Sequence, residues 1–95
     1  MDEIIGMMTK TPYDTEKTTL GKTFLKSHRI TTDQAIRMAK TITYDSYRLE
    51  LLLYAYDSCV DPENYFKCTD LLSYKTSKDK LLDKINANSG HRHRR

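Results

Sequence analysis

The stretch ITYDSYRLELL, from Ile42 to Leu52, has two weaker counterparts in this 95-residue chain. They are TPYDTEKTTLG at residues 11–21 and LSYKTSKDKLL at residues 72–82. The tyrosines of the three copies, Tyr13, Tyr44 and Tyr74, lie 31 and 30 residues apart. Self-similarity at a fixed period of about 20–50 residues is typical of repeat proteins. The alternative is that the likeness reflects only the amphipathic pattern that most helices share. Internal repetition therefore requires that other features, such as caps and turns, recur at the same interval.

Each tyrosine precedes a predicted amphipathic helix. In the central copy, apolar residues follow at helical spacing: Leu49, Leu52, Leu53 and Tyr56. The other side of this segment is also apolar, so we expect it to be buried between neighbours on several sides. We expect Asp45 to be its N-cap, with Tyr44 and Leu49 forming a hydrophobic staple. The expected caps elsewhere are Asp14 in the first copy and Thr76 or Ser77 in the third, where Lys75 cannot serve.

A second kind of helix precedes each tyrosine. ITTDQAIRMAK begins one such helix, with Thr31 and Gln34 spaced as a capping box. VDPENYFKCTDLL begins the next, with Asp61 as the expected cap and Pro62 at the first helical position. These helices align as well, because Asp2, Asp33 and Glu63 each stand 11 residues before a repeated tyrosine.

The two helix types predict an all-α fold: a short α-solenoid-like stack of about five helices, built from a helical-hairpin repeat of roughly 30 residues. We expect this domain to cover residues 1–87. After Ile85 the segment NANSGHRHRR has no apolar residue except Ala87, and we expect a flexible basic tail over residues 88–95.

The chain from residue 30 to residue 86 resembles domain-of-unknown-function family 4476. The matching positions are Tyr44, Asp45, Leu49, Leu51, Leu52, Val60, Asp61, Asn64, Leu71, Tyr74 and Leu81. Gly21 and the threonines depart from the pattern in the first copy, and Lys75 departs in the third. The resemblance implies a small helical domain found in many bacterial proteins and related to the N-terminal domain of the animal proline- and serine-rich protein 1. It implies no mechanism.

The net charge of +3 lies entirely in the tail. Residues 1–90 hold 13 Lys or Arg and 13 Asp or Glu, so the excess is Arg92, Arg94 and Arg95. Within the domain the charge is uneven, at +5 over residues 17–40 and −4 over residues 45–70. A nucleic-acid-binding protein usually carries basic charge on its folded surface as well, so this balance weighs against that class.

The apolar runs, the N-terminal sequence and the known catalytic motifs bear on the cellular location and on catalysis. The longest apolar run falls far short of the roughly 20 residues that a membrane span needs, and the acidic start MDEIIGMM is unlike a signal peptide. We therefore expect free thiols at Cys59 and Cys68 and a cytoplasmic or nuclear protein without a membrane partner. The chain contains no phosphate loop, GxSxG or HExxH pattern. His28 suits a structural role at a helix C-terminus, and we expect no catalytic residue, metal or cofactor.

Two functions remain open. The first is a non-catalytic adaptor or scaffold that binds a protein partner, such as an acidic segment, and also self-associates weakly. Its candidate contacts are Lys22, Lys26 and Arg29 on one helical stripe, with Arg37 and Lys40; the alternative for these residues is a solvated face. The second function is nucleic-acid or phosphate binding through the basic first hairpin and the arginine-rich tail. In both, we expect the repeated tyrosines to serve the core.

Overall fold

A computed structural model describes the backbone of residues 1–93 and the side chains of residues 1–87, and this part of the chain is all-α. Its elements are α1 (Asp2–Lys10), α2 (Asp14–Leu25), α3 (Thr32–Lys40), α4 (Asp45–Ala55), the 3₁₀ segments η1 (Tyr56–Ser58) and η2 (Pro62–Leu71), and α5 (Lys75–His93). The predicted helices are thus confirmed, including the short one at the N-terminus. Helix α5 continues past residue 88; the tail side chains lie outside the described residues, so the flexible tail stays a prediction.

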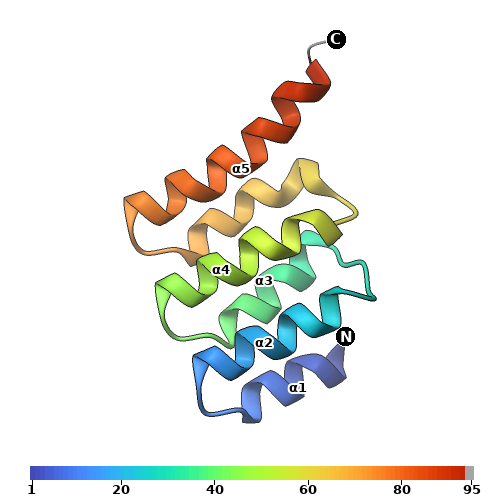
Figure 1. The fold of residues 1–95 in the computed structure, drawn as a ribbon, viewed down its shortest axis with the longest axis vertical. Helices are drawn as coiled ribbons and strands as arrows, with labels where there is room; N and C mark the ends of the chain where they lie inside the picture. The colour runs from blue at the N-terminus through green and yellow to red at the C-terminus, as the bar shows by residue number, and fades with distance from the viewer. Residues whose placement is uncertain (94–95) are drawn as a thin grey trace.

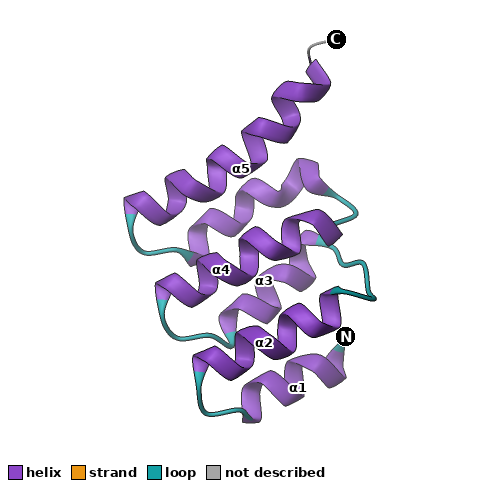
Figure 2. Cartoon of the chain, viewed as in Figure 1, coloured by secondary structure: helices purple, strands orange, loops and turns teal. Residues whose placement is uncertain are grey.

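The helices form two rows (Figure 1). One row contains α1, α3 and η2, and the other contains α2, α4 and α5, with direct packing between neighbours in each row. The turns that lead into α2, α4 and α5 all lie on one side of the molecule (Figure 2). The turns after α2 and α4 lie on the opposite side.

Segment η2 differs from the α-helix expected there. Its ends are closed by i to i+3 bonds, from Asn64 N to Asp61 O at 3.0 Å and from Leu72 N to Thr69 O at 3.1 Å. A 3₁₀ helix rises about 2.0 Å per residue against about 1.5 Å in an α-helix. The 10 residues of η2 therefore span as far as about 13 residues of α-helix would.

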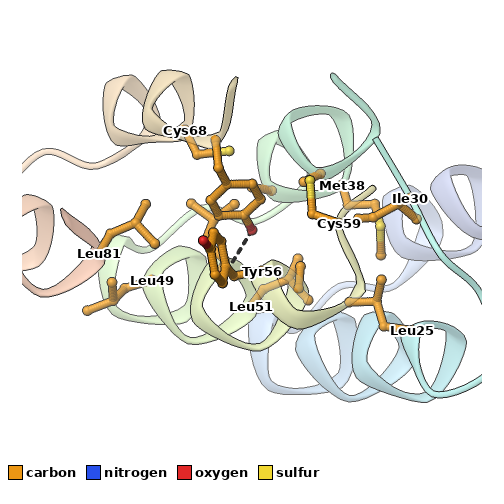
Figure 3. Packing of buried hydrophobic residues seen from close by; sticks show 14 of the residues in the cluster. Leu25, Ile30, Met38, Leu49, Leu51, Tyr56, Cys59, Cys68 and Leu81 are labelled. Atoms are coloured by element: carbon orange, nitrogen blue, oxygen red, sulfur yellow. Dashed lines mark hydrogen bonds between the residues drawn. The ribbon is translucent and has the colours of Figure 1, made fainter. Parts of the chain in front are cut away.

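The core is continuous from α1 to α5 (Figure 3). Helix α4 lies at the centre of the core and packs against α2, α3, α5 and η2. This agrees with the prediction made from the apolar residues on both of its sides. Leu51 and Leu52 of this helix are at most 1% exposed. Cys59 and Cys68 are free and buried, which confirms the expectation of unpaired thiols. Figure 3 shows both sulfur atoms within the apolar cluster.

On the side of the turns into α2, α4 and α5, carboxylates hold consecutive turns together. The Asp14 carboxylate, nine-tenths buried, accepts hydrogen bonds from the backbone N–H of Thr43 at 3.1 Å and of Tyr44 at 2.8 Å. The Asp45 carboxylate accepts from the N–H of Ser73 at 2.5 Å and from the Ser77 hydroxyl. Each aspartate at the start of one helix therefore fixes the turn that enters the next helix of its row.

The expected N-caps on this side are wrong. Helices α2 and α4 begin at Asp14 and Asp45, so the N-caps are the preceding tyrosines, with no side-chain cap bond. Helix α5 begins at Lys75, which places Thr76 and Ser77 inside it. The physical reason is competition for acceptors: the amides of the next turn have no helical partner, and the carboxylates satisfy those amides instead of their own helix.

A cation accompanies each of these carboxylates. Lys17 donates from Nζ to the carbonyl of Thr41 at 2.5 Å, at the end of α3. Arg48, 31 residues later, donates to the carbonyl of Leu71 at 2.9 Å, at the end of η2, and to that of Ile42 at 2.7 Å. Carbonyl groups at helix ends lack a donor within the helix. The aspartate of each pair therefore accepts from backbone N–H groups of the next turn, and the cation donates to a backbone carbonyl of the same turn.

The turns on the opposite side are joined through the backbone. Ile30 donates to Ser58 O at 3.0 Å, and Val60 donates to Ile30 O at 2.8 Å. The Asp61 carboxylate accepts from the N–H of Thr32 at 2.7 Å. A hydrogen bond from the Asn64 amide, aided by bonds from Thr32 and opposed by desolvation, lowers the pKa of Asp61 to about 2. The capping box of Thr31 and Gln34 forms as predicted.

Both ends of the helix rows lack the groups that join inner turns. Pro12 occupies the position of Thr43 and Ser73, and proline has no N–H to donate to a preceding carboxylate. Lys75 occupies the position of Asp14 and Asp45, so the last turn offers no carboxylate to a following one. Its ammonium instead pairs with Asp79 at 2.9 Å within α5. The turn at Pro12 therefore lacks the donor, and the turn at Lys75 lacks the acceptor, of the hydrogen bonds that join the inner turns.

Gly21 permits close packing of α2. A Cβ built there would lie 2.9 Å from Leu51 Cδ1 and 3.3 Å from Met38 Cε. Gly6 in α1 has nothing within 4 Å of such a Cβ. The two helical glycines therefore differ in kind, since one makes room for the core and the other only lowers helix propensity.

We predict that Asp14→Ala lowers the free energy of unfolding by about 1–2 kcal/mol, because two amides of the next turn lose their acceptor. Asp14→Asn keeps one acceptor oxygen and should cost less. Lys75→Ala, at the equivalent position with no turn to hold, should leave stability nearly unchanged. Urea unfolding measures all three, and an equal loss for Asp14→Ala and Lys75→Ala would contradict this assignment.

The glycines give a second comparison. Gly6→Ala should raise the free energy of unfolding by about 0.5–1 kcal/mol through helix propensity. Gly21→Ala should lower it by about 1 kcal/mol, because the added methyl overpacks the contact with Leu51. Thermal or urea unfolding of both variants checks the sign, and stabilisation by both would show that Gly21 has no packing role.

Candidate functional site

The basic residues expected to bind a partner are distributed over several elements. Helix α2 ends at Leu25, so Lys26 is its C-cap and Arg29 lies in the following turn. The expected single helical stripe of Lys22, Lys26 and Arg29 is therefore wrong. Helical spacing cannot carry a stripe past the residue at which the helix ends.

Two of the basic side chains already have partners within the fold. Lys22 Nζ lies 2.5 Å from Glu50 of α4 and 5.6 Å from the centre of the Tyr54 ring. Arg37 on α3 lies 3.0 Å from Asp2 of α1. Lys26, Arg29 and Lys40 are exposed. These pairs face different neighbours, so the basic residues do not converge on one hollow.

The repeated tyrosines form the most regular surface feature of the described residues. Tyr13, Tyr44 and Tyr74 are 66%, 66% and 67% exposed, and none of their hydroxyls has a hydrogen-bond partner within the described chain. Their expected place in the core is wrong. Tyr13 and Tyr44 are N-caps with extended backbone, so their side chains leave the helix end instead of joining its apolar stripe. We call these three residues the tyrosine edge.

The sequence contains the signal for this edge. Each tyrosine directly precedes the first residue of a helix, which is Asp14, Asp45 or Lys75. A residue that keeps phase with a helix start occupies the helix end, where a large side chain finds no neighbouring helix to cover it. The position of each tyrosine at a helix start therefore predicts exposure at the cap, outside the apolar stripe.

A groove lies between two members of the tyrosine edge. It has a volume of about 440 Å³ and is lined by Tyr44 and Tyr74 with polar residues of both helix starts, among them Ser46 and Ser73. Backbone contacts fix its walls, because the Asp45 carboxylate joins the two turns. Tyr13 continues the line, since its neighbour Asp14 bonds to the amide of Tyr44. The edge is therefore a built surface on rigid helix starts.

The charge along the tyrosine edge is balanced. Desolvation raises the pKa of Asp45, but the hydrogen bonds from Ser77, Ser73 and Tyr74 outweigh it and lower the pKa. Asp45 is thus ionised at neutral pH, at the first position of α4. A negative charge there offsets the partial positive charge of the helix N-terminus. Lys75 brings the opposite charge to the start of α5, so no single sign dominates.

Tyr56 and Tyr65 differ from the tyrosine edge because their side chains are buried. Tyr65 is fully buried and donates to the carbonyl of Leu52 at 2.6 Å. Tyr56 packs edge-on against Tyr65, with ring centres 5.1 Å apart, and its buried hydroxyl has no hydrogen-bond partner among the described residues. These two rings stabilise the centre of the fold, which distinguishes them from the exposed tyrosines.

The two thiols of the described residues are buried, and the one histidine among side chains 1–87 contacts the helix that precedes it. Burial raises the pKa of the Cys59 thiol and raises that of Cys68 to about 12. His28 lies beyond the end of α2, with Nδ1 2.9 Å from the carbonyl of Phe24 and its ring stacked on that residue. Among the side chains up to residue 87, no group of three or more His, Cys, Asp or Glu is placed to hold a metal ion. No helix of the described part is long and apolar enough to cross a membrane.

Comparison with known proteins gives one match. A family model described as Domain of unknown function (DUF4476) matches residues 1–85, from α1 through most of the described part of α5. This match confirms the family resemblance found in the sequence. No curated protein and no solved structure matches the chain.

The two core tyrosines yield a prediction. Tyr65→Phe should lower the free energy of unfolding by about 1 kcal/mol, because the buried bond to the Leu52 carbonyl is lost. Tyr56→Phe should raise it or leave it unchanged, since it removes a buried hydroxyl without a partner. Urea unfolding measures both, and a larger loss for Tyr56→Phe than for Tyr65→Phe would contradict the hydrogen-bond assignment.

Proposed function

We propose that this chain, which belongs to the DUF4476 family, is a non-catalytic adaptor that binds a protein partner along its tyrosine edge. In this proposal the two helix rows are a short array of helical hairpins with a period of roughly 30 residues. Such arrays place equivalent side chains at regular intervals and bind partners across several hairpins.

One observation carries the proposal. Three turns far apart in the sequence present the same side chain with nearly the same exposure, 66–67%. Tyrosine is enriched at protein interfaces because its ring contributes apolar area while its hydroxyl remains available for hydrogen bonding. A line of such residues on rigid helix starts needs little ordering on binding, which favours affinity.

The absence of catalysis is part of the proposal. It is supported by the buried thiols, whose raised pKa values keep them protonated near neutral pH, and by the contact that ties His28 to Phe24. A cytoplasmic or nuclear location is likewise proposed, from the cysteine usage. The kinship with the N-terminal domain of proline- and serine-rich protein 1 is also a proposal, based on the motif around Tyr44 and Asp61 and not on the family match.

The basic residues are a second contact surface in this proposal. Lys26, Arg29 and Lys40 are exposed and suit an acidic segment, whereas Lys22 and Arg37 would first have to leave Glu50 and Asp2. The ion pairs therefore favour the tyrosine edge as the main contact. Self-association by end-to-end stacking is disfavoured by Pro12 and Lys75, which remove the hydrogen bonds that join inner turns.

Nucleic-acid binding is the second candidate. Exposed aromatic rings stack on bases without regard to sequence, and the tyrosine edge supplies three of them. The balanced charge of residues 1–90 weighs against it, because phosphate contacts supply most of the affinity for nucleic acid.

Capture from matched cell extract tests the proposed function. The full chain should retain a protein partner after nuclease treatment, in a saturable manner. The variant Tyr13→Ser/Tyr44→Ser/Tyr74→Ser should retain at least about tenfold less, a loss expected for interface tyrosines. The matched control is Val60→Ser/Phe66→Ser, which removes side chains 52% and 54% exposed elsewhere on the surface and should bind normally.

Each other outcome points elsewhere. Capture that nuclease abolishes would replace the adaptor with nucleic-acid binding. Capture unchanged in the tyrosine variant but lost in Lys22→Glu/Lys26→Glu/Arg29→Glu would transfer the contact to the basic residues. Circular dichroism and thermal unfolding of every variant establish that loss of capture is not loss of fold.

A further inference from the structure

We infer that the tyrosine edge recognises an uncharged, proline-rich segment in the polyproline II conformation. This inference rests on the proposed function and names the chemistry of its partner. It is carried by the spacing of the tyrosines, by their unpartnered hydroxyls and by the balanced charge around them.

The spacing is the first argument. Helix α2 packs directly on α4, and α4 on α5. Directly packed helices lie about 8–10 Å apart, so tyrosines at the matching ends of these helices repeat at about that distance. A polyproline II helix has three residues per turn and rises about 3.1 Å per residue, which gives a repeat of about 9.3 Å. Every third residue of such a helix therefore meets the next tyrosine, and about seven residues reach all three.

Hydrogen bonding is the second argument. The hydroxyls of Tyr13, Tyr44 and Tyr74 have no partner within the described chain and can donate to a ligand. A polyproline II helix has no internal hydrogen bonds, so all its carbonyl groups remain free to accept. An α-helical ligand offers only its last carbonyls, because the others are used within the helix. The tyrosine hydroxyls of the edge thus suit a ligand whose backbone carbonyl groups are free to accept hydrogen bonds.

The shape of the surface agrees with this occupant. The groove of about 440 Å³ is lined by Tyr44 and Tyr74 and lies on the line of the edge. Aromatic residues flanking a shallow groove are the common way of binding proline rings, which pack flat against them. The stiffness of a proline-rich chain lowers the entropy lost on binding, which suits a surface of this modest size.

Charge decides between this ligand and an anionic one. Helix N-termini attract anions, but Asp14 and Asp45 place carboxylates at the first positions of α2 and α4. Glu16 adds a further negative charge beside Tyr13. An acidic peptide or a nucleic-acid strand would lie near these negative charges at two of the three helix starts. An uncharged ligand meets no such repulsion.

Titration of the full chain with a synthetic L-polyproline peptide of about nine residues, three turns of the helix, tests the inference. Two-dimensional NMR should show saturable shifts confined to the backbone around Tyr13, Tyr44 and Tyr74. Each single Tyr→Ser change should weaken binding about tenfold, and each Tyr→Phe change about threefold through loss of the hydroxyl. Phe66→Ser is the control and should bind as the unchanged chain does.

The D-polyproline peptide of the same length controls for composition, because its helix has the opposite hand; it should bind at least about tenfold more weakly. Equal binding of the two hands, or binding that survives the triple Tyr→Ser change, would overturn the inference. Shifts on the edge with oligothymidylate and none with polyproline would assign the edge to nucleic acid. Absence of polyproline binding, with edge-dependent protein capture intact, would refute the ligand while the adaptor stands; loss of both would refute both.

Discussion

The rest of the structure depends on one interaction, the carboxylate at the start of a helix that accepts the amides of the next turn. Asp14 holds the turn before α4, and Asp45 holds the turn before α5. An amide without a partner is costly, so these bonds fix where each following helix starts and which way it runs. The cations Lys17 and Arg48 fix the end of the helix that precedes the same turn. Packing of the core then follows from helices that are already in register.

This arrangement also accounts for the surface. A side chain that directly precedes the first residue of a helix stands at the helix end, outside the apolar stripe, and the three tyrosines are exposed for that reason. The same bonds that set the turns set the interval between the rings, so the regularity of the tyrosine edge is a consequence of the fold. Pro12 removes the donor from the turn into α2, and Lys75 removes the acceptor from the start of α5.

Local patterns in the sequence predicted most of the fold. Helical periodicity located the helices, and the spacing of Thr31 and Gln34 predicted a capping box that forms. The local sequence could not predict which amides donate to the Asp14 carboxylate. A carboxylate at a helix start can accept equally well from its own helix or from a turn 29 residues away. The ion pair of Lys22 with Glu50 likewise depends on which helices are neighbours. In the sequence, only Pro12, which lacks the amide, and Lys75, which lacks the carboxylate, indicate that the aspartates bond to a neighbouring turn and not to their own helix.

The most direct test of the central interaction is an NMR pH titration of the backbone amide protons. A proton donated to a carboxylate changes its chemical shift when that carboxylate is protonated. The account predicts that the amide of Ser73 titrates with the carboxylate of Asp45, at a pH below the usual aspartate range, and that this response disappears in Asp45→Asn. An amide shift at Ser73 that does not follow this carboxylate would contradict it, and the turn before α5 would then owe its position to core packing alone.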